Sequence, residues 1–232
     1  MRLGGLTRTT ALDFPGRVAA VVFTQGCNFT CPYCHNPQLV RPFGEPLAEE
    51  EALAFLRRRR PHLEGVVISG GEPTRQPDLA EFCKKLRGLG YAVKLDTNGS
   101  APQMVSDLIE RRLISYLALD LKADPRRYPR ELAPQDPGEA IVDTIAVVKR
   151  AGLPHEFRVT AAAPFINRHS LERIAQAAAG QARLYLQPCL LKTNLNPDFM
   201  RQNPPPGPDE LKELAALAAP YLPVKLRGME TF

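Results

Sequence analysis

The sequence lacks long hydrophobic runs and carries little net charge. No apolar run approaches the ~20 residues that a membrane-spanning helix needs, so no such helix is predicted. The first six residues lead into threonine and arginine before any apolar segment, which argues against a signal peptide. The 30 Lys and Arg residues stand against 25 Asp and Glu residues, and this mild excess does not establish nucleic-acid binding. We therefore expect a cytoplasmic protein that engages neither membranes nor nucleic acid.

Cysteine is also scarce, and its count is odd. Five cysteines in a chain expected in a reducing compartment argue against a disulfide framework. Three of them fall within eight residues, at Cys27, Cys31 and Cys34. Cys83 shares an apolar helical stripe, so we predict a core residue, and Cys189 follows a predicted strand without an assigned role. No second cysteine cluster follows, which disfavours an additional iron–sulfur domain.

The remaining composition is that of an ordinary globular protein. Hydrophobic residues make up 44% and charged residues 24%, which excludes disordered and fibrous classes. A length of 232 residues suits one sizeable core. We predict a single domain over 1–232, with its core at about 13–190, a proline-rich connector at 203–208 and a C-terminal helix and tail at 209–232. The one basic block, at 57–60, ends a predicted helix, where cations complement the helix dipole.

Short β-branched runs alternate with helical patterns along the whole chain. One helical stripe, for example, has Leu79, Phe82, Cys83 and Leu86 at i, i+3, i+4 and i+7. The predicted strands are 18–24, 65–69, 92–96, 116–121, 156–161, 184–187 and a tail strand 224–226. The predicted helices are 48–59, 78–89, 103–112, 139–151, 170–179 and 209–219.

This β-then-α order, repeated six times, calls for a parallel sheet with right-handed crossovers. Eight such units close a barrel in ~250 residues. Six units therefore predict an α/β fold of the partial (β/α)6 TIM-type barrel class, open on one side. A doubly wound open sheet is the alternative, which periodicity alone does not exclude. In both architectures ligands bind at the carboxyl ends of the strands.

The segment after the first predicted strand carries the three clustered cysteines in a loop punctuated by Gly26, Pro32 and Pro37. Thiolate sets of this kind select zinc or an iron–sulfur cluster. Structural zinc usually takes four ligands in two separated pairs, whereas this chain has one triplet, which His35 would have to complete. Three cysteines leave one iron of a [4Fe–4S] cluster without a protein ligand, and catalysis needs such an open position. We favour the cluster over zinc.

Three further strand ends carry polar residues. Gly70-Gly71-Glu72-Pro73 fits a plain tight turn equally well, but it would also let backbone approach a ligand and offer a carboxylate to an ammonium group. The next two strands end in Asp96-Thr97-Asn98-Gly99 and Asp120-Leu121-Lys122, and the strand-end acids Asp96 and Asp120 should face the same rim. Acids and a lysine at a buried rim need partners, which favours a functional role over turn chemistry alone.

The cysteine loop resembles that of a known family. Cys27, Cys31, Tyr33 and Cys34 match the Cys-x-x-x-Cys-x-x-Cys signature of radical S-adenosylmethionine (SAM) enzymes, with its aromatic residue before the last cysteine. The flanking Asp13-Phe14-Pro15-Gly16 and Cys34-His35-Asn36-Pro37 resemble the activases of glycyl-radical enzymes. Within that group the resemblance is greatest to anaerobic ribonucleoside-triphosphate reductase activating proteins. It covers about 13–187 and is strongest in the first hundred residues.

The resemblance implies that the three clustered cysteines hold a [4Fe–4S] cluster and that the strand ends bind SAM. Glu72 would then meet the methionine amino group, Lys122 its carboxylate, and Asp96 and Asp120 the ligand or a monovalent cation. The implied cofactor-binding residues are Tyr33, Gly70, Gly71, Glu72, Asp96, Asn98, Asp120 and Lys122, with no catalytic side chain beyond the cluster and SAM. After the fifth strand only weak candidates remain: Asn167 or His169 for the ribose and Gln187 for the adenine.

The implied reaction is reductive cleavage of SAM and formation of a glycyl radical on a partner enzyme, for which anaerobic ribonucleotide reductase is the first choice. The implied electron donor is a low-potential protein such as flavodoxin or ferredoxin. Two other classes stay open: a radical SAM enzyme that acts on a small molecule in a nucleoside-precursor or cofactor pathway, and a zinc module without catalysis.

Overall fold

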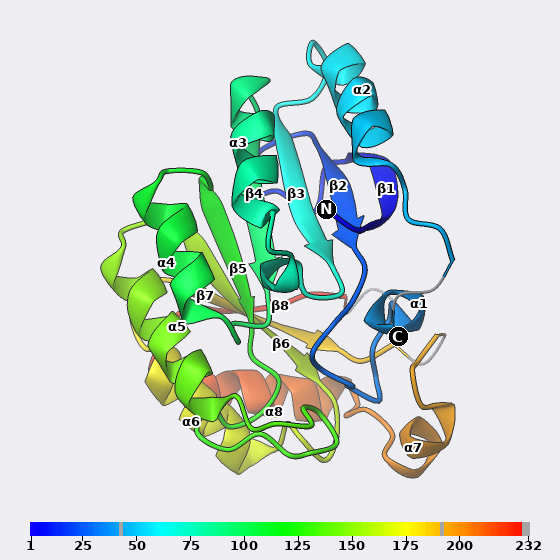
Figure 1. Ribbon diagram of the computed structural model, residues 1–232. Helices are drawn as coiled ribbons and strands as arrows, with labels where there is room; N and C mark the ends of the chain where they lie inside the picture. Colours follow the sequence, from blue (N-terminus) through cyan, green and yellow to red (C-terminus); the bar gives the residue numbers. More distant parts are fainter. Residues whose placement is uncertain (42–43, 191–192, 229–232) are drawn as a thin grey trace.

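The computed structural model describes residues 1–41, 44–190 and 193–228, so the last four residues of the predicted tail lie outside the described residues. One sheet of eight strands runs through the molecule in the order β1 to β8 (Figure 1). The strands are β1 (Leu3–Thr10), β2 (Ala19–Thr24), β3 (Gly65–Gly70), β4 (Ala92–Thr97), β5 (Tyr116–Asp120), β6 (His155–Ala161), β7 (Arg183–Pro188) and β8 (Val224–Leu226).

The strand order distinguishes the two predicted architectures. β2 to β8 pair in parallel with their chain neighbours, and β1 pairs antiparallel with β2. A doubly wound sheet reverses its strand order at a switch point, whereas each strand here joins beside the preceding one. Within the described residues β1 and β8 do not pair, so the curved sheet stays open. The prediction of a partial barrel open on one side is confirmed.

Helices cover the outer face of this sheet. The predicted helices are present within two residues at each end, and α2 ends in the basic turn that contains Arg57, Arg58 and Arg59. They are α2 (Glu49–Arg59), α3 (Leu79–Gly88), α4 (Pro102–Glu110), α5 (Gly138–Arg150), α6 (Arg168–Ala178) and α8 (Pro208–Ala218). In the described part of the chain, no helix is long and apolar enough to cross a membrane.

Strand β1 and three short helical segments were not predicted. Only Leu3 of β1 is buried, so the strand is held by its backbone pairing with β2 and not by an apolar face. Its sequence, with two glycines and a run of threonine and arginine, shows no strand alternation. The short segments are α1 (Pro37–Val40), η1 (Pro73–Arg75) and α7 (Pro197–Gln202), which are too brief for a helical period to appear.

The core has two parts. Helix stripes and the outward side chains of the sheet form the larger part, which includes Cys83 at 0% exposure, as predicted. Inside the curve of the sheet, a small apolar cluster of Phe14, Ala19, Val21, Val67 and Ala92 lies near the amino-terminal ends of the strands. Farther along β4, the inward side chains become charged, beginning with Lys94. The barrel interior therefore has an apolar floor beneath a polar mouth.

Candidate active site

A cavity of about 880 Å³ lies at the carboxyl ends of the strands. All predicted metal and SAM residues line this cavity, although they come from segments nearly a hundred residues apart in the sequence. They are Cys27, Cys31, Tyr33, Cys34, Gly70, Gly71, Glu72, Asp96, Asn98, Asp120 and Lys122. The structure therefore brings the predicted residues together, while the role of each remains a prediction.

The cysteine loop is held by its backbone. The N–H groups of Gly26 and Cys27 donate to the carbonyls of Leu39 and Val40 at 2.8 and 2.9 Å, so helix α1 closes the loop behind the first cysteine. The Thr30 N–H donates to the Leu132 carbonyl at 2.8 Å. Because these bonds use main-chain atoms, the three thiols remain available to a ligand.

Cys27, Cys31 and Cys34 all lie at the wall of this cavity. Within the described residues, no three Cys, His, Asp or Glu side chains converge tightly enough to hold a single metal ion. A structural zinc needs such convergence, with sulfur at ~2.3 Å from one centre. Three thiols at the wall of a wide cavity fit a multi-iron cluster better, because each thiol then binds a different iron.

Burial keeps two of these thiols protonated. It raises the pKa of Cys27 to about 12 and that of Cys31 to about 11, although Lys122 lowers both. Metal ligation requires thiolates, so cluster assembly must release protons and is favoured by rising pH. Tyr33, between the second and third cysteines, is buried, and its hydroxyl has no nitrogen or oxygen partner in the described chain. This polar atom at the cavity wall is suited to meet a ligand.

Two glycines, Gly70 at the end of β3 and Gly71 after it, are required by close packing against β2 and the cysteine loop. Gly70 has φ +116°, a conformation that side chains disfavour, and a Cβ on Gly71 would collide with the carbonyl oxygen of Gly26. The N–H of Glu72 donates to that same carbonyl at 2.8 Å. The sequence predicted that these glycines allow a ligand to approach; within the described chain, the nearest neighbours are Thr24 at the end of β2 for Gly70 and Gly26 at the start of the cysteine loop for Gly71.

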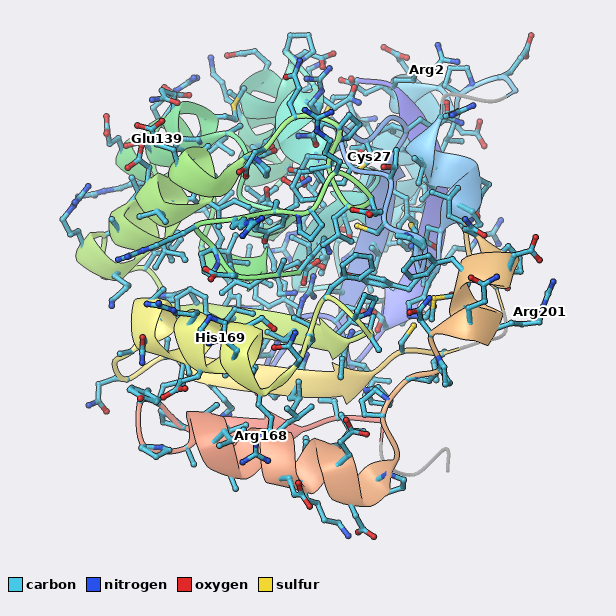
Figure 2. The ribbon with its side chains drawn as sticks, turned by 90° about the horizontal axis from the view of Figure 1, so that it is seen from below. Arg2, Cys27, Glu139, Arg168, His169 and Arg201 are labelled. Carbon is cyan, nitrogen blue, oxygen red and sulfur yellow. The ribbon has the colours of Figure 1, made fainter. Side chains whose placement is uncertain are left out.

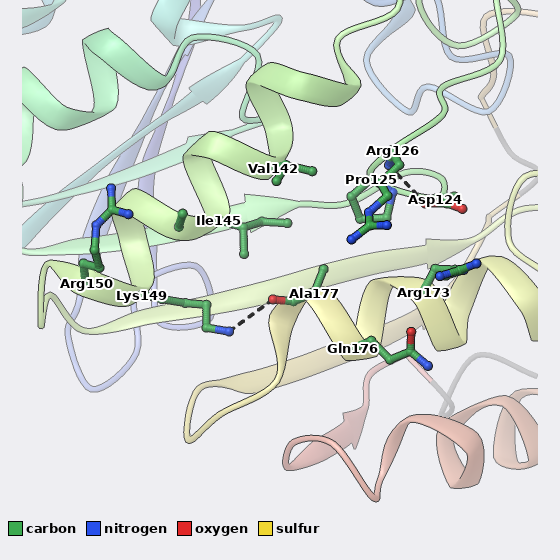
Figure 3. Close-up of a pocket in the computed structure, with 11 residues that line it drawn as sticks. Asp124, Pro125, Arg126, Val142, Ile145, Lys149, Arg150, Arg173, Gln176 and Ala177 are labelled. Carbon is green, nitrogen blue, oxygen red and sulfur yellow. Dashed lines mark hydrogen bonds between the residues drawn. The ribbon is translucent and has the colours of Figure 1, made fainter.

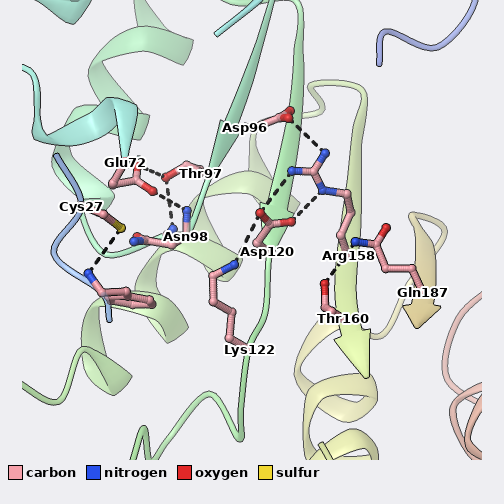
Figure 4. A network of polar contacts seen from close by, with 12 residues as sticks. Cys27, Glu72, Asp96, Thr97, Asn98, Asp120, Lys122, Arg158, Thr160 and Gln187 are labelled. Carbon is pink, nitrogen blue, oxygen red and sulfur yellow. Dashed lines mark hydrogen bonds and ion pairs between the residues drawn. The ribbon is translucent and has the colours of Figure 1, made fainter. Parts of the chain in front are cut away.

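Glu72 is a buried carboxylate that joins two strand ends (Figure 4). Its Oε1 accepts hydrogen bonds from the N–H and hydroxyl of Thr74 and from the hydroxyl of Thr97, at 3.0, 2.6 and 2.6 Å. Among the described residues, its Oε2 accepts one hydrogen bond, from the Asn98 N–H at 2.7 Å. Burial raises the pKa of Glu72, and these donors oppose that shift. Oε2 therefore keeps acceptor capacity for a ligand, whereas Oε1 is fully used.

Asn98 connects the same turn to the cysteine loop. Its Nδ2 donates to Oδ1 of Asn28 at 3.0 Å, and Nδ2 of Asn28 donates to Oγ of Ser100 at 2.9 Å. Asn28 directly follows the first cysteine. The β4 turn thus fixes the loop from the side opposite α1.

Arg158 on β6 is the main residue that sequence reasoning missed. Its Nη1 lies 3.0 Å from Asp96, and its Nε and Nη2 bind both oxygens of Asp120 at 2.6 and 3.1 Å (Figure 4). Lys94 binds the other oxygen of Asp96 at 2.6 Å, and Lys122 lies 3.6 Å from Asp120. The sequence did contain a signal for Arg158, because a charged residue at a buried position within a predicted strand needs a partner of opposite charge.

This network has three cations and two carboxylates. Burial would raise the pKa of Asp120, but Arg158 and Lys122 outweigh it and hold that pKa well below its usual range. Burial would lower the pKa of Lys122, but Asp120 reverses the shift and raises it. Both acids already meet cations of the chain, so they have no evident need for the monovalent cation expected from the resemblance. The surplus positive charge instead suits an anionic group.

The weaker ribose candidates lie elsewhere. Asn167 is not at the cavity, because its side chain accepts the Ser170 N–H at 3.0 Å and caps α6. His169 is exposed in the first turn of that helix and does not line the cavity. The structure therefore does not bring either residue to the cavity, since the chain after β6 turns directly into a capped helix. Gln187 does line the cavity, where it donates to Thr160 at 3.1 Å.

The ion network generates a prediction on acid stability. Arg158→Gln should lower the free energy of unfolding at pH 7 by roughly 2–4 kcal/mol, because it leaves two partly buried carboxylates without their shared partner. The pKa of Asp120 is depressed in the folded state, so its contribution is present above the unfolded value of about 3.9 and is lost as pH falls below it. The difference in free energy of unfolding between the wild type and Arg158→Gln should therefore be smaller at pH 3 than at pH 7, as measured by urea unfolding.

Arg168→Gln provides the matched control. Arg168 pairs with Glu213 at 3.4 Å, but both side chains are about two-thirds exposed, so this change should cost less than about 1 kcal/mol at either pH. An Arg158→Gln deficit of equal size at pH 7 and pH 3 would contradict the assigned electrostatic origin.

Comparison with known proteins places the fold and site in a family. Residues 21–178 match the radical SAM superfamily. A Methanocaldococcus jannaschii protein, whose name assigns it provisionally to the glycyl-radical enzyme activating enzymes, is 30% identical over 95% of this chain and 92% of its own length. The pyruvate formate-lyase-activating enzyme of Clostridium pasteurianum is 36% identical over 42% of this chain and 43% of its own. The 7-carboxy-7-deazaguanine synthase of Hyperthermus butylicus is 32% identical over 75% of this chain and 70% of its own length.

Solved structures share the fold at low identity. SuiB of Streptococcus suis, in a crystal structure bound to S-adenosylmethionine, aligns with a TM-score of 0.65 and 16% identity. The alignment covers 87% of this chain but 48% of SuiB, so this chain spans about half the length of that structure. Because the match extends over most of the chain, with the cysteine loop and the strand-end cavity inside it, the protein belongs to the radical SAM superfamily of enzymes, which use a [4Fe–4S] cluster and SAM.

Proposed function

We propose that this protein is an activase that forms a glycyl radical on a partner enzyme, with anaerobic ribonucleoside-triphosphate reductase as the partner. The observation that carries the proposal is the single cavity in which three cysteines meet the polar ends of β3, β4 and β5. The similarity to the Methanocaldococcus protein over nearly the whole length of both chains supports the activase class. The Asp-Phe-Pro-Gly and Cys-His-Asn-Pro flanks support the choice of partner. We further propose a cytoplasmic location and a flavodoxin or ferredoxin as electron donor.

Each part of the cavity has a proposed task. Cys27, Cys31 and Cys34 hold the cluster, which when bound supplies the electron that reductively cleaves SAM. Oε2 of Glu72 accepts from the SAM ammonium group, because it is the less occupied oxygen of that carboxylate. Lys122 meets the SAM carboxylate, supported by the surplus charge of the network around Arg158. The apolar floor around Phe14 and Val67 limits water below the reacting groups.

The open side of the barrel favours a protein substrate. The cavity also reaches Leu12 and Asp13, which follow β1 near the amino-terminal end of β2, and the segment from Lys225 to Gly228 at β8. These two flanks belong to strands that do not pair within the described residues. Leu12 is 87% exposed, which is unusual for a large apolar side chain beside a cavity. A peptide loop from a partner enzyme fits such a lateral opening, whereas a small-molecule enzyme would need a lid.

A radical SAM enzyme acting on a small molecule is the second candidate. The similarity to a 7-carboxy-7-deazaguanine synthase over three-quarters of this chain favours it. A zinc module has less support, since the chain offers one cysteine triplet rather than the two separated ligand pairs that are usual for structural zinc.

Cysteine variants test the cluster assignment. Replacing Cys27, Cys31 or Cys34 with serine should abolish both the visible iron–sulfur absorption of the anaerobic protein and its cleavage of SAM, because a hydroxyl does not replace a thiolate ligand. Cys83→Ala should leave both intact, since Cys83 lies in the core away from the cavity. Bleaching by Cys83→Ala, or full colour in Cys34→Ser, would disprove the assignment. A colourless wild-type protein that binds zinc would favour the zinc module.

A Glu72 variant tests the SAM site. Glu72→Ala should weaken SAM binding about 10- to 100-fold in calorimetry, since a charge-assisted hydrogen bond is worth roughly 1.5–3 kcal/mol. The cluster absorption should persist. Thr74→Val is the control, because it removes a hydrogen bond to Oε1 while leaving Oε2 unchanged, and its effect on SAM affinity should be much smaller. Equal affinities in wild type and Glu72→Ala would remove Glu72 from the ligand site.

Electron paramagnetic resonance tests the reaction itself. An anaerobic mixture of reduced protein, SAM and the ribonucleotide reductase of the same organism should give a glycine-centred doublet that requires all three components. Absence of the doublet, together with turnover of a free metabolite, would establish the small-molecule alternative instead.

A further inference from the structure

A second cavity lies on the outside of the barrel, between two helices. α5 packs closely against α4, and α6 packs closely against α8, but α5 and α6 make little contact with each other. The space between them has a volume of about 410 Å³ (Figure 3). Its lining consists of Asp124, Pro125, Arg126, Val142, Ile145, Ala146, Lys149, Arg150, Arg173, Gln176 and Ala177, which we call the basic groove.

The basic groove has an apolar floor and a cationic rim. Val142, Ile145 and Ala177 supply apolar surface, and Val142 is 38% exposed. Four cations, Arg126, Lys149, Arg150 and Arg173, border this surface, whereas Asp124 is the one acid among the lining residues. An apolar strip flanked by cations is complementary to an acidic segment that carries apolar side chains.

Three of the rim cations have no partner. Within the part of the chain that the structure describes, the guanidinium groups of Arg126, Arg150 and Arg173 form no ion pair or hydrogen bond. Lys149 donates to the carbonyl of Ala177 at 3.2 Å and so bridges the two helices. Elsewhere on α6 an exposed arginine, Arg168, does pair with an acid. The rim is therefore a concentration of unpaired positive charge that a negative partner would neutralise.

The loop that leaves β5 borders both cavities. Lys122 lines the active-site cavity, and Asp124, two residues later, lines the basic groove. The loop is tied at both ends, because the N–H of Lys122 donates to the Tyr128 hydroxyl at 3.0 Å and the N–H of Gly138 donates to Asp136 at 2.9 Å. Figure 2 shows this loop between Cys27 and the first turn of α5, marked by Glu139. A protein that covers the mouth of the barrel can thus extend over the groove.

We propose that the basic groove binds an acidic, amphipathic segment of the same partner enzyme whose glycine enters the active-site cavity. This inference rests on the proposed function. A small free anion fits less well, since the rim side chains are exposed and the floor is apolar. The segment anchors the partner while its glycine-bearing loop is inside the cavity, so the groove contributes to association and not to SAM cleavage.

Charge reversal of the rim tests the proposal on the cluster-loaded protein. The variant is Arg150→Glu combined with Arg173→Glu, and the matched control is Arg57→Glu combined with Arg58→Glu. Arg57 and Arg58 are exposed and lie in the last turn of α2, as Arg150 does in α5, while Arg173 is exposed in the middle of α6; the two variants change the net charge equally, at exposed helical positions. The measurements, with dithionite as reductant, are the KM and kcat for the reductase in glycyl-radical formation and SAM cleavage without the partner.

The groove variant should raise the KM for the reductase at least about tenfold, because like charges would now face the acidic segment. Its kcat, its SAM affinity and its partner-independent SAM cleavage should equal those of the control. Raising ionic strength from about 0.15 to about 1 M shortens the Debye length from ~8 to ~3 Å and should erase most of the difference by weakening the wild type.

Three results would overturn the proposal. An unchanged KM would mean that the partner does not use the groove. An unchanged KM with slower cluster reduction by reduced flavodoxin would assign the groove to the electron donor. A wild type that cleaves SAM but forms no glycyl radical on the reductase would refute the proposed function itself, and the groove assignment with it.

Discussion

The site depends on one buried carboxylate, Glu72, whose charge must be matched by hydrogen bonds because it has left water. Four donors from the ends of β3 and β4 meet it, so two loops that are independent in the sequence become one rigid unit. Asn98 extends this unit to Asn28 in the cysteine loop. A loop without regular structure thereby acquires a fixed position relative to three strand ends.

A second group of charges organises the opposite wall. Arg158 spans β4 and β5 by binding Asp96 and Asp120, while Lys94 and Lys122 complete the pairing. Loss of one of these ion pairs would leave a buried charge without its partner, so the group behaves as a unit. The two walls differ in sign: the Glu72 side offers an acceptor, and the Arg158 side carries surplus positive charge. That polarity matches the ammonium and carboxylate ends of an amino acid, as SAM presents them.

Much of this arrangement could be predicted from the sequence, because parallel strands carry their following residues to one edge. The cysteines, Glu72 and Lys122 follow strands whose apolar runs are evident, Asp96 lies near the end of such a strand, and all of them line one cavity. Arg158 was missed because it lies inside a strand, where register rather than proximity to a turn decides its direction. β1 was missed because pairing with β2, not an apolar pattern, holds it. The capping role of Asn167 was not predicted, because a helix cap and a ligand contact call for the same kind of side chain.

The cysteine loop has anchors that lie far along the chain. Thr30 donates to the carbonyl of Leu132, and the N–H of Asn196 donates to the carbonyl of Pro32 at 2.9 Å. Strands that join in chain order can assemble from the amino terminus as synthesis proceeds, since each contacts its predecessor. The loop gains its last anchor only when α7 has emerged from the ribosome. A truncated form of the chain that ends before α7 would lack this anchor of the cysteine loop.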